Sequence, residues 1–297
     1  MNKTIFALGI FDGVHLGHQA LLKRCRELAE EAGCQAGAVT FASHPDALVL
    51  GSSPVLINTM DDRKRLLHRW TDQVIILPFD REMRTTPWEA FLNLLRRDYG
   101  AVGFVCGDDF RFGARGAGNQ ELLRRYCREN GLPCAVVPEQ TVDHCRVSST
   151  KIRSLLEAGD VEKAAAFLGH PHILSGTVVH GRQLGRTMGV PTANLALPEE
   201  LAVLRFGVYA CRVTVEGKQY PAVANVGTRP TVEGHGITVE PWILDFSGDL
   251  YGREITVEFH KFLRPERKFR SLEELHREIL RNARQTRAYI GKLPETI

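Results

Sequence analysis

Two histidines with a Leu-Gly spacer are the first residues of the chain whose types and spacing suggest chemistry. His15 and His18 follow the apolar run Ile5–Ile10, which predicts a strand, and precede Gln19–Ala32, whose apolar spacing predicts an amphipathic helix. The turn from a strand into a helix presents free backbone N–H groups and the positive end of the helix dipole, and both favour an anion. We expect the two imidazoles to donate hydrogen bonds to phosphate oxygens as negative charge develops in a transition state.

Glycines on both sides of the first histidine would let the backbone approach a bulky nucleotide closely. A glycine-rich surface turn with two exposed histidines is the alternative interpretation. The octad Phe11–His18 contains a segment that resembles the H-x-G-H signature of nucleotidyltransferases. Its full sequence, F-D-G-V-H-L-G-H, resembles the motif of the bifunctional riboflavin kinase/FMN adenylyltransferase family, the bacterial FAD synthetases. The resemblance implies an ATP site formed by Phe11, Gly13 and Gly17, with the two histidines as catalytic groups.

The overall composition is that of a globular protein with one large or two ordinary domains. The chain has 297 residues, of which 43% are hydrophobic and 25% are charged. No run approaches the roughly 20 apolar residues of a membrane span, and the N-terminus enters the first predicted strand directly, so we expect neither a membrane segment nor a signal peptide. The formal net charge of +3 suits small anionic substrates and is too small to indicate nucleic acid. The seven cysteines lack C-x-x-C spacing, which predicts buried, reduced thiols in a cytoplasmic protein.

Strands and helices alternate through the first half of the chain with short links. This order predicts a parallel sheet covered by helices on both faces, with ligands at the carboxyl ends of the strands. After the first helix, the predicted strands are Gly37–Phe41, Gln73–Leu77, Ala101–Cys106 and Pro133–Val137, and the predicted helices are Asp61–Trp70, Thr86–Tyr99 and Asn119–Asn130.

A second motif, Gly107–Gly113, follows the strand that ends at Cys106. Its aromatic rings could stack on a flat ligand, and Asp109 could accept hydrogen bonds from that ligand or orient Mg²⁺ through water. The alternative is an acidic turn with two core phenylalanines. The motif resembles the G-x-D-F-R-F-G element on the flavin side of FAD synthetases, which implies flavin contacts from Asp109, Phe110 and Phe112 and a mobile glycine-rich loop after them.

A third motif, Val147–Arg153, places hydroxyl groups at a helix start and basic side chains in its first turn. Ser and Thr are ordinary N-cap residues, but basic side chains at this end oppose the helix dipole unless an anion is present. The segment resembles the I-S-S-T-x-I-R element with which the family grips the ATP triphosphate. The resemblance implies that Ser148, Ser149 and Thr150 bind ATP. It also implies a catalytic Arg153, whose planar guanidinium suits phosphate.

One departure from the family pattern lies after the second predicted strand. The family has T-F-E-P-H-P, whereas this chain has Ala42 and Ser43 in place of the acid and the first proline. His44 and Pro45 are kept, so the difference concerns the tuning of the adenylation site rather than its presence.

The second half of the chain has a different pattern, and a His-Pro-His segment at 170–172 marks the linker between the halves. Apolar runs with β character are separated by Gly and Pro turns, which predicts a small antiparallel β-barrel. The runs are Ile173–Val179, Gly207–Val215, Gln219–Asn225, Ile237–Phe246 and Glu254–Phe262. A terminal helix follows, with Ser271 and Glu274 in the spacing of a capping box. The basic runs Arg264–Arg270 and Arg281–Arg287 are expected to be solvated faces, and attraction of a nucleotide is the alternative.

The segment Gly181–Asn194 has three glycines four residues apart. Such a loop can wrap phosphates with its N–H groups, although its spacing matches neither a Walker A nor a Rossmann fingerprint, and a plain glycine-rich turn is the alternative. Thr192 and Asn194 offer the hard oxygen ligands that Mg²⁺ prefers. The segment resembles the G-R-x-x-G-x-P-T-A-N signature of riboflavin kinases. The resemblance implies a metal held by those two residues, and ATP contacts from Gly181, Gly185, Arg186 and Gly189.

A carboxylate interrupts one of the apolar β runs. Glu240 lies where an unpaired charge would be costly, and a buried structural glutamate is the alternative to a catalytic one. Val239–Phe246 resembles the V-E-x-x-I-L-D-F strand of riboflavin kinases, and Asn225–Pro230 resembles their N-x-G-T-R-P turn. The resemblance implies that Glu240 is the base for the riboflavin 5′-hydroxyl, and that Asn225 and Arg229 bind the flavin.

These motifs cover both halves in the order of the bifunctional family. We therefore expect a Rossmann-like α/β nucleotidyltransferase domain with a parallel sheet at residues 1–172, and an antiparallel β-barrel riboflavin kinase domain with a C-terminal helix at residues 173–297. The expected reactions are phosphorylation of riboflavin by ATP to FMN, then adenylylation of FMN by a second ATP to FAD and pyrophosphate, with Mg²⁺ as the cofactor. The expected partners are these small molecules, without nucleic acid or membrane, and weak self-association stays open.

Two other classes of function remain as alternatives. One is a ligase acting on tRNA, because aminoacyl-tRNA synthetases also carry H-x-G-H with a downstream loop bearing Ser and Lys. The other is a flavin-binding regulator without catalysis. The kinase motifs argue against the first, and the retained Glu240, His15 and His18 argue against the second.

Overall fold

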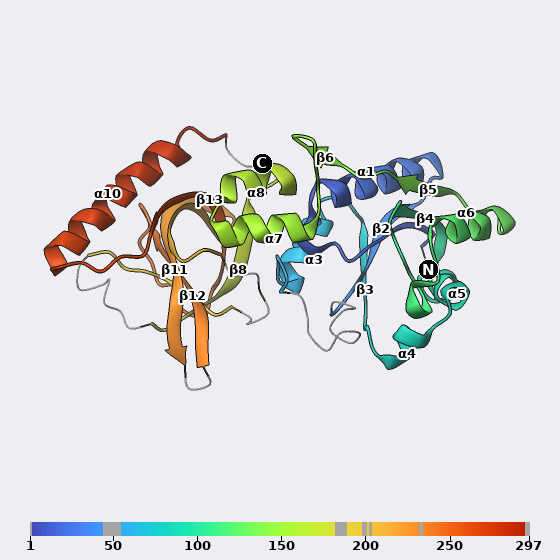
Figure 1. The fold of residues 1–297 in the computed structure, drawn as a ribbon, viewed down its shortest axis with the longest axis horizontal. Coiled ribbons are helices and arrows are strands. Elements are labelled where there is room, and N and C mark those ends of the chain that lie inside the picture. Colours follow the sequence, from blue (N-terminus) through green and yellow to red (C-terminus); the bar gives the residue numbers. More distant parts are fainter. Residues whose placement is uncertain are drawn as a thin grey trace. The chain divides into compact units, whose positions relative to one another are not determined.

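The computed structural model of the chain describes residues 2–43, 55–181, 189–197, 201, 204–231 and 234–294. They form two compact units (Figure 1). The first unit comprises Met1–Val55 and Arg63–Ser149, and the second comprises Leu56–Asp62 and Thr150–Ile297.

The first unit is built on a parallel five-stranded sheet with the strand order β3-β2-β1-β4-β5. The strands are β1 Thr4–Leu8, β2 Gln35–Phe41, β3 Gln73–Leu77, β4 Ala101–Gly107 and β5 Cys134–Val137. Every residue of the central strand β1 is buried, because helices cover both faces of the sheet. The predicted α/β architecture is confirmed. Since β1 and β4 are neighbours, the motifs that follow them meet at the same carboxyl edge of the sheet.

Helices pack on this sheet through the apolar faces that the sequence pattern predicted. They are α1 Leu16–Glu31, α3 Met60–Leu67, α4 Arg81–Thr85, α5 Trp88–Tyr99 and α6 Gln120–Glu129. Apolar residues of α5 and α6 share one core with Phe6 and Phe104. Helix α1 packs against β1 and β2, where the Cys25 thiol lies 3.1 Å from the carbonyl oxygen of Ile5. Because neighbouring strand residues point to opposite faces, Ile5 and Phe6 contact different helix layers.

Two helix boundaries differ from the prediction for local reasons. The first helix begins at Leu16 rather than at Gln19, because His15 has an extended backbone and caps the helix with its side chain. The predicted helix Thr86–Tyr99 begins two residues later, at Trp88, and a separate short helix, α4, which the sequence did not indicate, ends before it at Thr85. Helix α5 ends at Gly100, whose positive φ of 71° closes the helix in the left-handed conformation that glycine favours.

The second unit contains a closed barrel with the strand order β10-β11-β12-β9-β8-β13, and all six neighbouring pairs of these strands are antiparallel. Its strands are β8 His172–Val179, β9 Asn194–Leu195, β10 Gly207–Val215, β11 Lys218–Thr231, β12 Gly234–Ile243 and β13 Glu254–Pro265. Helices α7 Ser149–Ala158 and α8 Val161–Leu168 precede the barrel, and α8 packs on β8 and β13. The predicted barrel is confirmed, and the short strand β9 is an element that the sequence pattern did not indicate.

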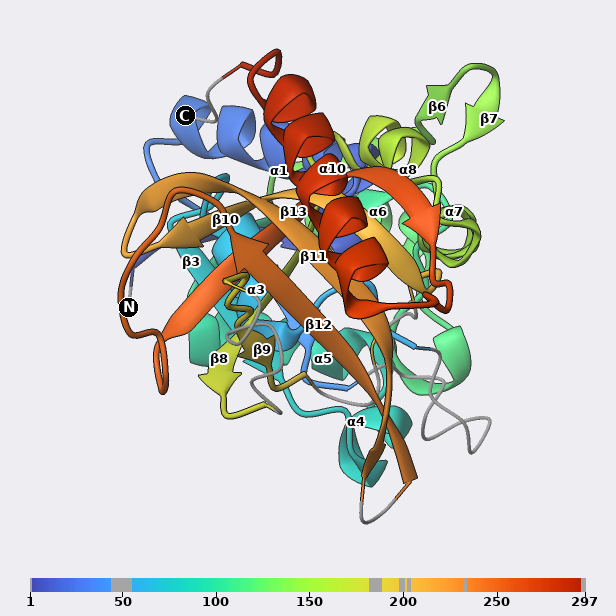
Figure 2. The ribbon, with the colours of Figure 1, turned by 90° about the vertical axis from the view of Figure 1, so that its left-hand side faces the viewer.

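Helix α10, Leu272–Ile290, follows the barrel and lies across β10 and β11 (Figure 2). Ala283 of the helix shares a core with Val208 and Val223 of those strands. Half of the predicted capping box is confirmed, because the N–H of Glu274 donates to Ser271 Oγ at 3.2 Å. The Glu274 carboxylate accepts instead from the N–H of Arg270, one residue before the N-cap, at 2.9 Å.

The cysteines are free thiols of unequal exposure. Those at positions 25, 106, 127 and 211 are buried as predicted, whereas Cys145 is exposed, so the expectation of buried thiols is wrong there. Burial raises the pKa of the Cys25 thiol to about 11, which keeps it protonated and unreactive. In the described part of the chain, no helix combines the length and the apolar character that crossing a membrane requires.

Candidate active sites

The residues between β1 and α1 form a strained turn, which we call the histidine turn and define as Ile10–His18. Phe11 and Val14 have φ angles of 55° and 41°, although neither is a glycine. Non-glycine residues held there cost of order 1–3 kcal/mol each and persist only where the surroundings fix them. Gly13, with φ of 81°, is the one position of the turn where the left-handed conformation suits the residue type.

The two histidines of this turn lie face to face. Their ring centroids are 3.7 Å apart with an interplanar angle of 13°, and the ring of Phe11 meets His18 edge-on at 5.2 Å. The backbone N–H of His18 donates to Nδ1 of His15 at 3.3 Å. Because Nδ1 accepts, the proton of a neutral His15 lies on Nε2.

The electrostatics of the turn keep His18 uncharged without a ligand. Burial, and then the proximity of His15 and of the Arg63 guanidinium, lower the pKa of His18 well below 6.5. Nδ1 of His18 is buried without a hydrogen-bond partner. An anion arriving at the turn would favour the protonated form, so the site can change its charge when a phosphate binds.

Gly17 has a role that the sequence pattern did not reveal. A Cβ atom built on it would lie 3.1–3.2 Å from the ring of His15. The glycine therefore makes room for the histidine ring over the first turn of α1. The sequence pattern attributes this glycine to a close approach of the backbone to a nucleotide. The position of the His15 ring is by itself sufficient to explain why a glycine is needed here.

The third motif meets the histidine turn through its serine. Ser149 Oγ donates to the carbonyl oxygen of Asp12 at 3.0 Å. Ser148 precedes α7, Thr150 lies in its first turn, and half-buried Arg153 lies one turn beyond Ser149 on the same helix face. Two of the three hydroxyl groups, those of Ser149 and Thr150, thus lie inside the helix, and only that of Ser148 lies before it.

The second motif contacts Arg146, which directly precedes the third motif and which the sequence analysis did not identify. Asp109 pairs with Arg146, which also lies 2.8 Å from Glu139. Arg146 lies in a small hairpin formed by β6 Thr141–Val142 and β7 Cys145–Arg146, directly before the third motif. A basic residue next to a motif is a weak sequence signal, and only the hairpin brings it to the carboxylate.

The two phenylalanines of the second motif have different environments. Phe112 is 6% exposed and lies in the core with Trp88 and Phe91, at centroid distances of 6.3 and 6.0 Å. Phe110 is only partly buried and stacks on Phe112 at 5.7 Å. Phe110 is therefore the ring that a flat ligand could reach, with Phe112 as its support.

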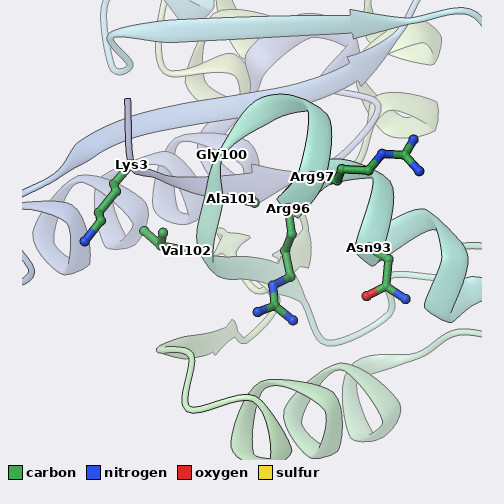
Figure 3. A pocket seen from close by; sticks show the side chains of 7 residues that line it. All are labelled: Lys3, Asn93, Arg96, Arg97, Gly100, Ala101 and Val102. Carbon is green, nitrogen blue, oxygen red and sulfur yellow. The ribbon is translucent and has the colours of Figure 1, made fainter. Parts of the chain in front are cut away.

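A cavity of about 500 Å³ in the first unit is lined by Lys3, Asn93, Arg96, Arg97 and Gly100–Val102 (Figure 3). These residues lie where β1 and β4 begin, which is the opposite edge of the sheet from the histidine turn. Arg96 donates to Asn130 at 2.6 Å and Arg97 pairs with Asp98 at 2.6 Å, so both cations already have partners. The cavity is separate from the motifs.

In the barrel, Glu240 lies between two asparagines on neighbouring strands. The ladder pairs it with Asn225 of β11, and the pairing of Val239 with Leu195 sets it beside Asn194 of β9. The N–H of Ala193 donates to the carbonyl oxygen of Pro241 at 2.9 Å, which confirms that register. Cross-strand partners point to the same face, so Asn225, Glu240 and Asn194 form one row, which we call the carboxylate row.

The carboxylate row borders a pocket of about 720 Å³ that also contains Thr192. Period-two alternation explains the lining, because Val190 and Thr192, Val223 and Asn225, and Glu240 and Trp242 are pairs two residues apart. The remaining lining residues are Val208, Arg264, Glu266, Arg267, Lys268, Phe269, Leu275, Ile279 and Asn282.

The segment 264–269 departs from the expected solvated basic face at Arg264 and Phe269, whereas Arg267 and Lys268 are exposed as expected. Arg264 is only 17% exposed at its side chain, donates to Asn282 Oδ1 at 3.0 Å and lies 3.6 Å from Glu278. Arg267 pairs with Glu278 at 3.1 Å, and both guanidinium groups lie over the ring of Phe269, at 5.5 and 4.7 Å. In the sequence, the presence of Phe269 inside a basic run indicates that part of this run packs against a ring, since a solvated face rarely needs an aromatic side chain.

The glycine-rich segment of the barrel is described only in part. A Cβ on Gly181 would lie 2.4–2.7 Å from the amide of Asn194, so this glycine admits the asparagine side chain. Gly189 has φ of 71°, and the following residues enter the pocket. Gly185, Arg186 and, in the first unit, His44 lie outside the described residues. Arg229 lies in β11, and its side chain also lies outside the described part.

The donor set at the pocket suits a metal that arrives with its substrate. Thr192 lines the pocket with a hydroxyl, whereas the amide of Asn194 in the adjoining strand β9 is buried and does not line it. The described residues contain no cluster of three or more His, Cys, Asp or Glu able to hold a metal. Mg²⁺ commonly uses few protein ligands together with water and phosphate oxygens. The residues therefore fit a nucleotide-bound Mg²⁺ better than a resident metal.

Comparison with known families divides the chain into two parts, as its two groups of motifs do. A family model described as FAD synthetase matches residues 1–151, and one described as riboflavin kinase matches residues 168–290. Curated relatives match nearly the whole chain. The chain belongs to the bifunctional riboflavin kinase/FMN adenylyltransferase family.

Relatives in this riboflavin kinase/FMN adenylyltransferase family come from distant bacteria. The protein of Listeria monocytogenes is 31% identical over 99% of this chain and 95% of its own length. Those of Pseudomonas fluorescens and Escherichia coli K12 are 37% and 36% identical, over 91% and 97% of this chain and 88% and 93% of their own lengths. A crystal structure titled as a macrolide-efflux protein from Streptococcus pneumoniae has a TM-score of 0.85 and 30% identity, over 96% of this chain and 94% of that one.

Proposed function

We propose that the barrel pocket phosphorylates riboflavin and that the site at the histidine turn adenylylates the FMN produced, each with its own ATP. The observation that carries this proposal is the convergence of Glu240, Asn225 and Thr192 on one barrel pocket, in a chain whose histidine motif lies in another compact unit. We place the functional division at residue 172, with the adenylyltransferase at 1–172 and the kinase at 173–297.

In the kinase reaction, Glu240 accepts the proton of the riboflavin 5′-hydroxyl as that oxygen attacks the γ-phosphorus of ATP. A sugar hydroxyl is a poor nucleophile at neutral pH, so a positioned base contributes. Asn225 orients the flavin tail, and Thr192 with Asn194 would hold the Mg²⁺ that neutralises the phosphates. Gly181, Gly185, Arg186, Gly189 and Arg229 are the further contacts proposed for ATP and the flavin. Phe269 and Trp242 offer apolar surface for the flavin ring.

In the adenylyl transfer, the FMN phosphate attacks the α-phosphorus of ATP and pyrophosphate leaves. The nucleophile is already ionised at neutral pH, so no protein base is required. His15, His18 and Arg153 stabilise the charge that develops on the phosphates. Hydroxyl groups of the third motif and the backbone of the histidine turn hold the triphosphate. The proposed ATP contacts are Phe11, Gly13, Gly17, Ser148, Ser149 and Thr150, and the proposed flavin contacts are Asp109, Phe110 and Phe112.

Free thiols and small anionic substrates support a cytoplasmic setting. We propose that the enzyme acts on ATP, riboflavin and FMN with Mg²⁺, without nucleic acid or membrane, and that any self-association is weak. If the purified chain shifts tRNA in a gel, the proposal that the enzyme acts without nucleic acid is contradicted.

The experiment is a time course of purified protein with riboflavin and MgATP, followed by chromatography of the flavins and an assay of pyrophosphate. FMN should form first and FAD later, with one pyrophosphate released per FAD. Absence of both products, or release of pyrophosphate without FAD, would refute the proposal. Replacing riboflavin by FMN tests the second step alone.

A further inference from the structure

Arg63 of helix α3 is a charged side chain buried inside the first unit. It is 1% exposed and is the largest of the fully buried side chains. Burying a guanidinium is costly unless it is paired, and arginine is rarely found fully buried without a specific task. No motif drew attention to this residue, because the sequence shows it only as one of several basic residues in a predicted helix.

The contacts of Arg63 lie at the ends of the two central strands. Nη1 donates to the carbonyl oxygen of Ile10 at 3.2 Å and lies 3.5 Å from that of Phe41, and Nη2 lies 3.7 Å from the carboxylate of Asp12. Thr40 Oγ1 also donates to the carbonyl oxygen of Ile10 at 2.7 Å. Ile10 follows β1 and Phe41 ends β2, so the guanidinium joins the carboxyl edges of both strands.

These contacts lie on both sides of Phe11, one of the two strained residues of the histidine turn. Phe11, with φ of 55°, lies between the carbonyl of Ile10 and the carboxylate of Asp12, and Arg63 contacts both. A strained turn is kept only when its neighbours fix it. The ring of Phe11 in turn meets His18, so the position of the guanidinium is transmitted to the histidine pair.

Arg63 also acts on His18 through its charge. The groups facing His18 in this unit are the stacked His15, the ring of Phe11 and the guanidinium, with Asp12 as the acidic neighbour of Arg63. Together with burial and with His15, the charge of Arg63 disfavours a proton on His18. The same fixed positive charge favours an anion at the turn.

We propose that Arg63 is a positioning residue for adenylyl transfer: its guanidinium fixes the histidine turn in the strained geometry that presents His15 and His18 to the triphosphate. This inference rests on the proposed function of the first unit. A lysine cannot replace the arginine, because one ammonium cannot reach two carbonyl oxygens and a carboxylate with the geometry of a planar fork. Misplacement of catalytic groups by about 1 Å can cost on the order of 10²-fold in rate.

The test compares Arg63→Lys, Arg63→Ala and the control Arg65→Met, which changes an exposed side chain of the same helix. Kinetics of FAD formation from FMN give kcat and the KM for ATP. FMN formation from riboflavin in the same samples reports on the barrel, and circular dichroism reports on folding.

We expect both Arg63 variants to lose on the order of 10²-fold in kcat for FAD formation, with a smaller change in the KM for ATP. FMN formation and the control variant should match the unchanged protein. Added guanidinium should restore part of the activity of Arg63→Ala, and the pKa of His18, followed by NMR of labelled histidine, should rise in that variant.

If Arg63→Lys folds and forms FAD at an unchanged rate, the proposal is overturned. This holds even if Arg63→Ala fails to fold. If the pKa of His18 is unaltered and FMN and FAD formation are lost equally, Arg63 has only a structural role, and the proposal is overturned as well. If the unchanged protein makes no FAD from FMN, the proposed function has failed instead.

Discussion

The histidine turn and the carboxylate row hold their reactive side chains in different ways. The turn relies on strain at Phe11 and Val14, a buried guanidinium and a histidine kept uncharged by its surroundings. The row relies on the regular register of β11, β12 and β9, which sets Asn225, Glu240 and Asn194 side by side without unusual backbone angles.

The difference agrees with the nucleophile that we propose for each site. A hydroxyl must lose a proton, so the kinase site needs a carboxylate, and a regular sheet can hold one between two amides. A phosphate is already ionised, so the adenylyl transfer site needs hydrogen-bond donors where charge develops. Strained turns and helix starts supply such donors at the edge of a parallel sheet.

Removal of the divalent cation should have the largest effect. The barrel pocket offers a hydroxyl and an amide as ligands in its described part, so the metal should depend on ATP for most of its coordination. Chelation should lower FMN formation by about 10²-fold or more, and Mg²⁺ should restore it. Calorimetry should detect tight Mg²⁺ binding only with ATP present, and tight binding by the protein alone would contradict this view of the pocket.

Asn225→Asp should disturb the carboxylate row without affecting the other site. Nδ2 of Asn225 donates to Glu266 at 3.3 Å, and Glu240 lies directly across the ladder, so the substitution places a third carboxylate between two others. FMN formation should fall about tenfold at neutral pH and recover partly as pH rises, because like charges make loss of a proton harder.

The pH profile of FMN formation is the measurement, with Gln219→Glu on the same strand as the control and FAD formation from FMN as the internal reference. An unchanged profile would mean that the Asn225 side chain does not contact the reacting groups.

Arg146→Ala should affect binding of FMN more than stability. The ion pair of Arg146 with Asp109 is exposed, with side-chain exposures of 51% and 64%, and exposed pairs contribute little to folding. We expect the KM for FMN to rise several-fold while the melting temperature and the KM for riboflavin stay constant. Arg128→Ala, at an exposed position of α6, is the control. A change in the KM for riboflavin instead would contradict the assignment of Asp109 to the adenylation site.

His172→Phe should have the smallest effect, and only at low pH. Burial, with a smaller contribution from His170, lowers the pKa of His172 from 6.5 to about 3, and neither ring nitrogen has a hydrogen-bond partner. Because the unfolded chain binds the proton more readily, the stability of the barrel is full above pH 6.5 and decreases as pH falls from 6.5 toward 3.

The phenylalanine variant should lose less stability over that range, which thermal unfolding at several pH values can measure. His68→Phe, at an exposed position, should keep the pH dependence of the unchanged protein. Equal pH dependence of all three proteins would show that His172 is protonated in the folded state.

The sequence predicts the parts of the molecule that depend on periodicity. Apolar runs between Gly and Pro turns predict the strands of the barrel, and apolar spacing in the helices predicts the α/β unit. It could not reveal Arg63, because that contact depends on where α3 lies beside β1 and β2, nor Arg146, which reaches Asp109 only through the β6–β7 hairpin. Such long-range contacts leave no local pattern in the chain.

Within the solvated face expected at 264–270, Arg264 and Phe269 depart from the expectation for a related reason. Composition indicates charge, but only the position of α10 over β10 and β11 turns Arg264 and Phe269 into pocket residues. The resemblance to a family supplied the roles of single residues, and the structure supplies the neighbours that explain them.

The most direct test of two separate sites is complementation between two blocked variants. Glu240→Gln should make FAD from supplied FMN but not from riboflavin, and His18→Ala should stop at FMN. Neither alone should convert riboflavin to FAD, whereas their mixture with riboflavin and MgATP should produce FAD by passing FMN through solution. FAD made from riboflavin by either variant alone, or the loss of both activities through one substitution in a folded protein, would contradict the account.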